Sequence, residues 1–389
     1  MRGIAISSRL ALTLALAAFA PTVFAQSKPR ARQLGVPFEG TPGPWNAITD
    51  VRGVEVGETT LISGTSVRTG VTAILPRGKQ NRGAVFAGWF SQNGDGEMTG
   101  TTWVEESGFL DGPVMITNTH SVGVVRDAVI AWQVKTGLTP STNTYGQSFF
   151  SLPVVAETFD GFLNDVNGFH VKPDHVFQAL ESAQSGPVKE GNRGGGTGMR
   201  CYGFKGGTGT ASRKLEPGAG GYTVGVLVQC NCGTRNQLTV AGVPVGREIP
   251  GNLQRSASEG ERETEVGSII IVMATDAPLL PHQLKRLARR ATMGLARTGS
   301  TSGNSSGDIF IAFSTANPDA ARPAGLASLK MLPNQEMNDL FSASVQATEE
   351  AIVNAMVAAE TITGANNHSV AALPHDALKS ALKKYNRLQ

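Results

Sequence analysis

The sequence contains few cysteines and histidines, and its positive and negative charges almost balance. Only 3 cysteines occur among 389 residues, which excludes a disulfide-dense scaffold. The 6 histidines include no H-E-x-x-H motif and no other i, i+4 pair, so we expect neither a metal nor another cofactor. A net charge of +3 provides no basic track for nucleic acid. With 40% hydrophobic and 17% charged residues, the composition is that of a soluble globular protein rather than a disordered chain or a polytopic membrane protein.

The three cysteines do not form a zinc motif. Cys201, Cys230 and Cys232 lack C-x-x-C spacing, and their odd number leaves at least one thiol without an intrachain disulfide partner. Cys230 and Cys232 lie two residues apart on an expected strand, so their side chains should point to the same face. We predict that they are small packing residues rather than ligands.

The one long apolar run lies at the N-terminus and has the features of a secretory signal. Arg2 and Arg9 bracket a positive segment, Leu10 to Ala20 is apolar but too short to span a bilayer stably, and Val23 to Ala25 is a small-residue cleavage site. This pattern predicts a signal peptide over residues 1–25, a mature chain beginning at Gln26, and export, most simply to a bacterial periplasm.

Short apolar runs and helical repeats indicate a layered architecture. After Pro281, apolar residues from Leu284 to Leu295 repeat at i, i+3 and i+4, which predicts a helix. Asn334 is expected to cap a second helix that ends near Gly364. Both layers need an apolar partner, so we predict a layered α/β or α+β sandwich. The runs expected to be strands covered on both faces are Val71 to Leu75, Ala84 to Phe90, Val114 to Thr117, Tyr222 to Gln229, Ser268 to Ala274 and Ile309 to Phe313.

Several short motifs match catalytic patterns in the wrong context. Residues 303–307 read G-x-S-x-G, but an expected helix precedes them and a strand follows, the reverse of a nucleophile elbow. Ser380 and Lys383 form S-x-x-K and residues 135–137 form K-T-G, in reversed order and without S-D-N. The glycine-rich residues 193–209 lack the G-K-[ST] ending of a phosphate loop, so they are interpreted as turns of close backbone approach.

The junction between Gly267 and Ser268 is a candidate for self-cleavage. The polar segment from Ser256 to Glu265 is expected to be an exposed loop, and a buried strand begins just after it. Glycine tolerates the strained backbone that an N-to-O acyl shift requires. A serine freed there would carry both a hydroxyl and an α-amine of pKa about 7.7 to 8.0, which can accept the hydroxyl proton without a histidine.

The residues around this junction resemble a known family. The segment from Gly267 reads GSIIIVMATDAPLLPHQLKRLARRATMGLARTGSTSGNSSGDIFIAFSTAN, which closely resembles the β-peptidyl aminopeptidases and the related L-aminopeptidase/D-Ala-esterase/amidases. The resemblance spans almost the whole mature chain in order. Further matching blocks are NAITDVRGVEVGETTL, ITNTHSVGVVRDAV, VVAETFDGFLNDVNG, GGGTGMRCYGFKGGTGTASR and VGVLVQCNCG.

The resemblance implies a precursor that cuts itself before a serine and works as two chains of one catalytic domain. In this chain the cut would separate residues 26–267 (the α chain) from residues 268–389 (the β chain). The implied fold is a four-layer αββα sandwich of the α+β class, similar to N-terminal-nucleophile hydrolases but with different strand connectivity. Such units commonly assemble as tetramers of αβ heterodimers.

The resemblance also implies the roles of individual residues. Ser268 matches the nucleophile and Asn231 the asparagine of the oxyanion hole. Ser306 and Asp308 match the serine and acidic residue beside the nucleophile's amine, although some relatives carry glutamate in place of Asp308.

Two further positions match residues that contact substrate. Glu157 matches the carboxylate that pairs with the substrate's ammonium. Phe159 stands where some relatives carry a catalytic tyrosine, so that hydroxyl is missing here, which favours the β-peptidyl branch. Residues 119–121 are expected to line the site without an assigned role.

These inferences lead to one hypothesis and two alternatives. The chain is expected to be a self-cleaving serine aminopeptidase that removes N-terminal residues from short peptides, β-peptides or amino-acid amides and esters through an acyl-enzyme on Ser268. Its partners would be substrates with a free N-terminal amine, and neither nucleic acid nor a membrane. The alternatives are an acyltransferase similar to ornithine acetyltransferases and a non-catalytic periplasmic binding protein.

Overall fold

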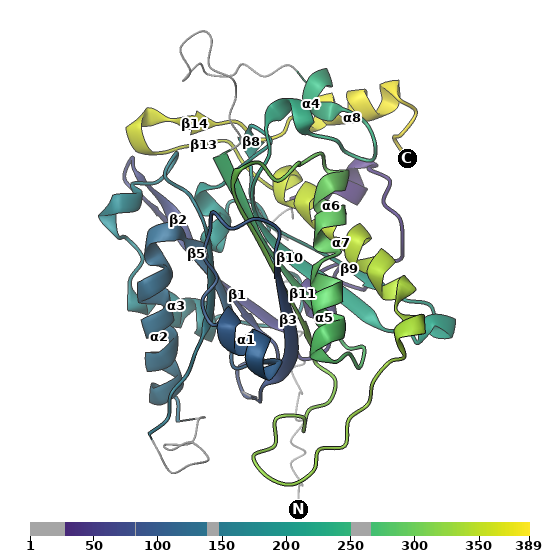
Figure 1. Cartoon of the computed structure of the whole chain (residues 1–389). Helices are drawn as coiled ribbons and strands as arrows, with labels where there is room; N and C mark the ends of the chain where they lie inside the picture. Colours follow the sequence, from purple (N-terminus) through teal and green to yellow (C-terminus); the bar gives the residue numbers. More distant parts are fainter. Residues whose placement is uncertain (1–27, 82, 138–147, 250–265) are drawn as a thin grey trace, which may run out of the picture.

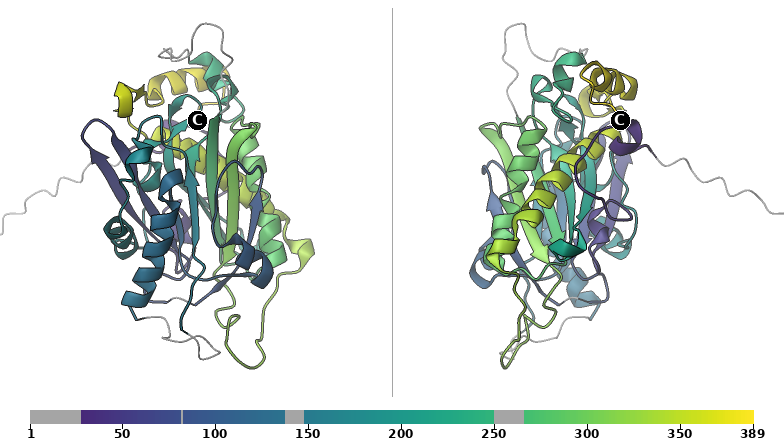
Figure 2. Two further views of the ribbon diagram at one scale, coloured as in Figure 1. Left: turned by 60° about the vertical axis from the view of Figure 1, so that its left-hand side comes forward. Right: turned by 90° about the vertical axis from the view of Figure 1, so that its right-hand side faces the viewer.

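Two β-sheets face each other, and helices cover the outer face of each (Figures 1 and 2). The computed structural model describes residues 28–81, 83–137, 148–249 and 266–389. The proposed signal peptide and the charged segment from Ser256 to Glu265 lie outside these residues. No helix in the described part of the chain is long and apolar enough to cross a membrane.

The smaller sheet has four strands in the order β1-β2-β5-β6. Strands β5 and β6 are parallel and the other neighbours are antiparallel. Its strands are β1 (Glu55–Ser63), β2 (Val67–Leu75), β5 (Val114–Asn118) and β6 (Val154–Thr158).

The larger sheet has six strands in the order β4-β3-β12-β11-β10-β9. Only β11 and β12 are parallel. Its strands are β3 (Val85–Ser91), β4 (Phe109–Leu110), β9 (Gly207–Lys214), β10 (Thr223–Asn231), β11 (Val266–Thr275) and β12 (Ser305–Ser314). Two small hairpins join β7 (Arg200–Cys201) to β8 (Phe204–Lys205) and β13 (Ile362–Thr363) to β14 (Ser369–Val370).

The helices divide between the two outer faces. Helices α2 and α3 pack on the smaller sheet, and α5, α6 and α7 pack on the larger one (Figure 2). The α-helices are α1 (Thr101–Ser107), α2 (Val122–Lys135), α3 (Pro173–Glu181), α4 (Val245–Glu248), α5 (Pro281–Ala288), α6 (Ala291–Arg297), α7 (Asn338–Val357) and α8 (His375–Lys384). Short 3₁₀ helices span Ala31–Leu34, Ile48–Asp50, Thr119–Ser121, Val166–Gly168, Gly194–Gly198, Pro217–Ala219, Arg235–Gln237, Asn334–Glu336 and Ala365–Asn367.

Alternation along the strands divides the core into three layers. On β11, Ile269 and Ile271 belong to the cluster beneath the helices, whereas Ile270 and Val272 belong to the cluster between the sheets. A third cluster joins the smaller sheet to α2 and α3. A strand buried on both faces needs apolar residues at nearly every position, which explains the continuous apolar runs. The αββα expectation is therefore confirmed.

All six expected strands are present, and the main differences concern their ends and the helices. Strand β11 begins at Val266, so Gly267 and Ser268 lie inside the strand rather than at its boundary. The expected single helix after Pro281 is two helices, because residues 289–290 form a turn that separates them. Gly294 of α6 then packs directly against Thr348 of α7, since a Cβ at Gly294 would lie 2.5 Å from the Cβ of Thr348.

The prediction for Asn334 was wrong. Asn334 begins a separate 3₁₀ turn, and its Oδ1 accepts hydrogen bonds from Gln283 Nε2 at 3.1 Å and Arg286 Nη1 at 2.8 Å. Helix α7 starts later, at Asn338. It also ends earlier than expected, at Val357 rather than near Gly364, because Glu360 pairs through its backbone with the side chain of Asn192.

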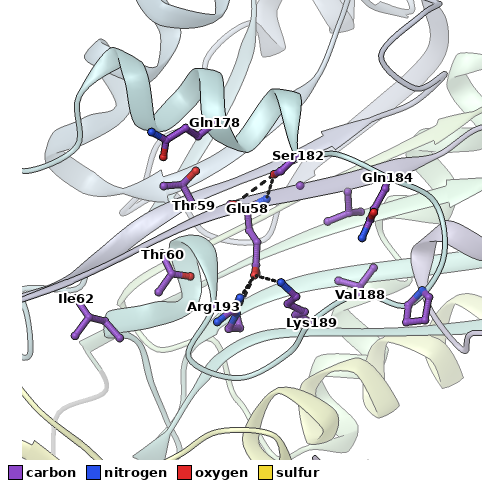
Figure 3. Close-up of a pocket in the computed structure, with 13 residues that line it drawn as sticks. Glu58, Thr59, Thr60, Ile62, Gln178, Ser182, Gln184, Val188, Lys189 and Arg193 are labelled. Atoms are coloured by element: carbon purple, nitrogen blue, oxygen red, sulfur yellow. Dashed lines mark hydrogen bonds and ion pairs between the residues drawn. The ribbon is translucent and has the colours of Figure 1, made fainter. Parts of the chain in front are cut away.

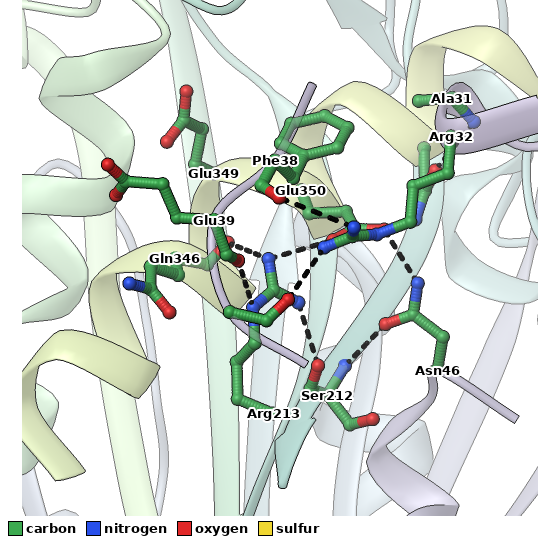
Figure 4. A network of polar contacts seen from close by, with 12 residues as sticks. Ala31, Arg32, Phe38, Glu39, Asn46, Ser212, Arg213, Gln346, Glu349 and Glu350 are labelled. Atoms are coloured by element: carbon green, nitrogen blue, oxygen red, sulfur yellow. Dashed lines mark hydrogen bonds and ion pairs between the residues drawn. The ribbon is translucent and has the colours of Figure 1, made fainter. Parts of the chain in front are cut away.

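A buried ionic cluster ties the N-terminal segment and β9 to helix α7 (Figure 4). The Glu350 carboxylate of α7 accepts hydrogen bonds from Arg32 Nε at 2.9 Å and from Asn46 Nδ2 at 2.6 Å, and it lies 2.8 Å from Arg213 Nη2. The side chains of Glu350 and Arg213 are each 1% exposed. Buried charges remain stable only when they are paired and hydrogen-bonded, so each member of this cluster depends on the others.

Removing the charge of Glu350 is expected to destabilise the fold strongly. Glu350→Gln leaves two guanidinium groups without their carboxylate, and breaking a buried pair costs about 3–5 kcal/mol of unfolding free energy. Urea unfolding would measure this loss. The matched control is Glu105→Gln, which breaks the exposed ion pair with Lys285 and is expected to cost about 1 kcal/mol or less. Equal losses in the two variants would contradict the prediction.

Candidate active site

Three adjacent strands bring the candidate catalytic residues to one end of the larger sheet. On β11, Ser268 lies directly opposite Asn231 of β10 and opposite Gly307 of β12. Gly267 lies opposite Ser306 in the same parallel register. Residues that are far apart in the sequence are therefore neighbours because of backbone pairing alone.

Ser268 is buried, and its hydroxyl faces the preceding peptide. Its Oγ donates a hydrogen bond to the Gly267 carbonyl oxygen at 2.7 Å, and the residue is 4% exposed. Gly267 is not among the glycines with positive φ, so the expectation of a strained backbone is not met. Glycine is needed instead for close approach, because a Cβ here would lie 2.6 Å from the Asn231 carbonyl oxygen.

Ser306 and Asp308 form a hydrogen-bonded pair next to β11. The Ser306 hydroxyl donates to Asp308 Oδ1 at 2.7 Å, and both residues are fully buried. Asp308 is adjacent to Ile309 on the strand, so their side chains point to opposite faces, and Ile309 packs between the sheets. The pair therefore lies on the helix side of the sheet. Ser268 is two residues from Ile270 on β11, so its side chain shares the face of Ile270 between the sheets.

Asn231 has its side-chain amide oriented by two backbone contacts. Its Oδ1 accepts a hydrogen bond from the Arg200 N–H at 2.8 Å, and its Nδ2 donates to the Phe159 carbonyl at 3.0 Å. An amide nitrogen carries two hydrogens, so one donor remains beyond the bond to Phe159. As an antiparallel partner of Ser268, Asn231 presents its side chain to the same face.

Glu157 is a buried carboxylate at the end of β6. It is 3% exposed, its Oε1 accepts a hydrogen bond from the Glu97 N–H at 3.0 Å, and its Oε2 accepts one from the Thr119 hydroxyl. No lysine or arginine among the described residues forms an ion pair with it. Burial raises its pKa, and the hydrogen bond from Thr119 partly offsets this effect. Such a site favours a cation brought by a ligand.

Aromatic side chains occur close to Glu157 and Thr119 in the sequence. Phe159, two residues after Glu157, is 44% exposed. The ring of His120, the residue after Thr119, stacks on that of Phe169, with 5.9 Å between ring centroids. The block at residues 119–121, which sequence analysis left without a role, thus contributes the Thr119 hydroxyl to Glu157.

The loop at residues 92–100, which no sequence pattern singled out, contacts both Glu157 and β12. Asn93 Oδ1 accepts a hydrogen bond from the Asp308 N–H at 2.9 Å, and its Nδ2 donates to the carbonyls of Ser302 and Gly303. A Cβ at Gly96 would lie 2.9 Å from the Gly307 Cα and 3.2 Å from Glu157 Oε1. The signal in the sequence was only a polar, glycine-containing loop, which is common.

Asp160 is a second buried carboxylate near Glu157, and no sequence pattern singled it out. Burial raises its pKa to about 6, although hydrogen bonds from Thr69 and Asn118 oppose the shift. Its backbone carbonyl accepts hydrogen bonds from the N–H groups of Leu163 and Asn164. Asp160 therefore fixes the turn that carries the Phe159 carbonyl to Asn231.

The cysteines lie immediately beside Asn231. Cys230 and Cys232 have their Sγ atoms 3.7 Å apart, so the prediction that they point to the same face is confirmed. Cys201 of β7 joins them, with its Sγ 2.9 Å from that of Cys230. Spacing alone did not reveal this third thiol, because β7 and β10 meet only in the fold.

Two of the motifs set aside on context, G-x-S-x-G and the glycine-rich block, have structural roles. The serine of G-x-S-x-G, Ser305, begins strand β12 after helix α6, so no nucleophile elbow exists there. In the glycine-rich block, Cβ atoms at Gly196 and Gly198 would each lie 2.3 Å from backbone atoms of other segments, as expected for close approach.

An open groove of about 560 Å³ runs along β1 (Figure 3) and is separate from these residues. Its lining is largely polar and includes Glu58, whose carboxylate pairs with Arg193 at 2.6 Å and Lys189 at 3.9 Å. None of the candidate catalytic residues lines it. The chemistry of Ser268 therefore does not coincide with this groove.

Comparisons with known proteins agree with this arrangement. The family model of peptidase family S58 matches residues 46–370. The chain is 56% identical over 377 residues to the beta-peptidyl aminopeptidase BapA of Sphingosinicella microcystinivorans, covering 92% of this chain and 93% of the relative. It is 48% identical to BapA of Sphingosinicella xenopeptidilytica, covering 97% and 96%.

Solved structures share the fold. The L-aminopeptidase D-Ala-esterase/amidase of Ochrobactrum anthropi, described as a prototype of the serine aminopeptidases and a new variant among the Ntn hydrolase fold, matches with a TM-score of 0.83 and 48% identity over 93% of this chain and 100% of that chain. A Burkholderia sp. beta-aminopeptidase matches with a TM-score of 0.82 and 46% identity over 92% and 99%. Neither expected alternative, acyl transfer or non-catalytic binding, is favoured by these matches. The chain belongs to peptidase family S58 and is a hydrolase, a serine aminopeptidase.

Proposed function

We propose that the chain matures by cutting itself between Gly267 and Ser268 and then acts as an N-terminal-nucleophile aminopeptidase on short peptides, β-peptides and amino-acid amides or esters. The observation that carries the proposal is the 2.7 Å contact between Ser268 Oγ and the Gly267 carbonyl oxygen, opposite Asn231. Both β-peptidyl relatives and the esterase/amidase neighbour support the substrate range.

The self-cleavage follows from that contact. Ser268 Oγ attacks the Gly267 carbonyl carbon, the bond to the Ser268 nitrogen breaks, and the hydroxyl proton passes to that nitrogen. Water then hydrolyses the resulting ester, which releases the Gly267 carboxylate and leaves Ser268 with a free hydroxyl and a free amine. The products are an α chain of residues 26–267 and a β chain of residues 268–389.

In the mature enzyme the α-amine of Ser268 accepts the proton from its own hydroxyl. With an unperturbed pKa of about 7.7 to 8.0, this amine is a suitable general base near neutral pH. The register that pairs Gly267 with Ser306 supports a role for the Ser306–Asp308 pair in orienting the amine, not the hydroxyl, because their side chains lie on the opposite face of the sheet. The pair can relay the proton to the leaving amine.

Asn231 stabilises the charge that develops on the substrate carbonyl. One Nδ2 hydrogen is committed to the Phe159 carbonyl, and the second is available to the oxyanion. The bond from the Arg200 N–H to Oδ1 prevents the amide from flipping. A donor fixed in advance costs no reorganisation during the reaction.

Glu157 selects substrates with a free amine. Its carboxylate is buried, and among the described residues it accepts hydrogen bonds from the Glu97 N–H and the Thr119 hydroxyl but forms no ion pair with a lysine or arginine. A substrate ammonium therefore supplies the missing positive charge. Phe159, exposed beside it, provides an apolar surface for the N-terminal residue. Following the resemblance, we extend the proposal to export by the segment 1–25 to a periplasm and to assembly as a tetramer of αβ heterodimers.

Ser268→Ala is expected to abolish both self-cleavage and hydrolysis, because the same hydroxyl performs both. On a denaturing gel the variant should remain one chain, whereas the wild type gives two fragments, the smaller beginning Ser-Ile-Ile-Ile. Ser305→Ala serves as the matched control and should be cut normally. Two fragments from Ser268→Ala, together with hydrolysis of an aminoacyl p-nitroanilide, would overturn the proposal.

Asn231→Ala is expected to lower kcat by about 10²–10³, the usual loss when one oxyanion-hole donor is removed. Steady-state hydrolysis of an aminoacyl p-nitroanilide by the processed enzyme measures it. Asn236→Ala, at an exposed asparagine five residues away, should leave kcat within about twofold. A reduced rate in both variants would argue against an oxyanion role.

The pH dependence of KM should report the ionisation of Glu157. Its pKa lies above the ordinary 4.5, so the carboxylate loses its charge, and KM rises, as the pH falls through this raised value. Glu157→Gln should raise KM about 30-fold or more and remove this acid limb. Glu97→Gln, at a nearby exposed carboxylate, should keep the acid limb but move it to lower pH, because the charge of Glu97 raises the pKa of Glu157. An unchanged acid limb in Glu157→Gln would refute the assignment.

A further inference from the structure

Three buried thiols meet behind Asn231. The Sγ atom of Cys201 lies 2.9 Å from that of Cys230 and 3.4 Å from that of Cys232. The Sγ atoms of Cys230 and Cys232 are 3.7 Å apart. All three residues are at most 2% exposed and carry free thiols. Among the described residues no other three cysteine, histidine or acidic side chains bring possible metal ligands so close together.

A strained hairpin holds the third thiol in place. The turn between β7 and β8 has positive φ at Tyr202 (51°) and Gly203 (67°), the conformation of a tight type I′ turn. Tyrosine rarely adopts it. Here the Tyr202 N–H donates to the Cys232 carbonyl at 2.7 Å, and its hydroxyl contacts Thr298 Oγ1 at 2.7 Å. The thiol of Cys201 is thus fixed against the other two by the surrounding structure.

A buried cation lies beside the thiols. Lys205 is fully buried, and its Nζ donates to the carbonyls of Gly196 at 3.2 Å and Gly206 at 2.9 Å. No carboxylate in the described part of the chain forms an ion pair with it. Burial lowers the pKa of Lys205 to about 7, and interactions with Cys201 and Cys230 oppose this shift. These sulfurs, as thiolates, can therefore supply the negative charge that keeps the buried lysine protonated.

We propose that Cys201, Cys230 and Cys232 bind one thiophilic divalent metal ion, of which zinc is the representative, through three thiolate sulfurs. Zinc–sulfur bonds of about 2.3 Å at tetrahedral angles separate the sulfurs by about 3.8 Å, so the thiols need move apart by at most about 1 Å. The fourth position is left for a small ligand such as water.

The charges of this complex balance. The three thiols release three protons on binding, and the complex of three thiolates with a divalent ion then carries one negative charge, opposite to that of Lys205. A disulfide would join only two of the sulfurs and leave the third thiol outside the bond. A monovalent ion would leave one negative charge in excess.

Occupation of this site would stiffen the end of β10. Cys230 and Cys232 flank Asn231 in the sequence, and a Cβ at Gly267 would lie 3.0 Å from the Cys232 Cα. Joining the two cysteines to the β7–β8 hairpin therefore fixes the segment that carries the amide of Asn231. The proposed site binds no substrate, and its test does not depend on catalysis.

Zinc binding to the untagged full chain, reduced and stripped of metal, tests the proposal. Competition with a chromophoric chelator should give one tightly bound Zn²⁺ per chain, and zinc should raise Tm because it binds only the folded state. Cys201→Ser should lose both effects. Ser268→Ala keeps all three thiols and should retain both effects even without activity. Lys205→Met should bind zinc more weakly at the same stoichiometry.

Three results would overturn the proposal. One is zinc bound no better by the wild type than by the variant with all three cysteines changed to serine. The second is a wild-type chain that yields fewer than three free thiols when it is denatured before any reductant is added, which indicates a disulfide. The third is tight binding of cuprous ion without binding of zinc. Circular dichroism of each cysteine variant distinguishes a lost ligand from a lost fold.

Discussion

The hydrogen-bonded pairing of β11 between β10 and β12 is the constraint on which the site depends. One antiparallel and one parallel neighbour fix Ser268 against Asn231 on one side and against the Ser306–Asp308 segment on the other. The positions of these groups are therefore set by backbone geometry, with little freedom for side-chain adjustment. A site built on paired strands is more precise than one built on loops. Here the larger sheet carries Ser268, Asn231, Ser306 and Asp308, whereas Glu157 lies on the smaller sheet.

Buried carboxylates have opposite uses in different parts of the molecule. Glu350 is surrounded by guanidinium groups that belong to the fold, so its burial holds elements together. Glu157 is almost as deeply buried, but within the described residues it is hydrogen-bonded by a hydroxyl and a backbone N–H and forms no ion pair with a lysine or arginine. The first arrangement completes the structure, and the second creates a specificity that only a ligand can satisfy.

The sequence was sufficient for the layers but not for the contacts between them. Continuous apolar runs such as Ile269–Val272 identify doubly covered strands, because both faces must be apolar. Strands β1 and β9, rich in threonine and glycine, gave no such signal. The sequence-based roles of Ser268, Asn231 and Glu157 came from resemblance, and the structure adds their distances. Asn93, Asp160 and the approach of Cys201 to Cys230 depend on long-range packing, which no local pattern records.

The ionic cluster of Figure 4 joins residues from both sides of the proposed cleavage point in the sequence. Arg32 and Arg213 precede Gly267, whereas Glu350 follows it, so each portion made alone would have to bury charge without its counterpart. Under the proposed self-cleavage, both portions would therefore be expected to fold as one polypeptide before the cut. Assembly from separately synthesised fragments would require each to remain partly unfolded until it met the other, and a gene split at this point would yield aggregation-prone halves.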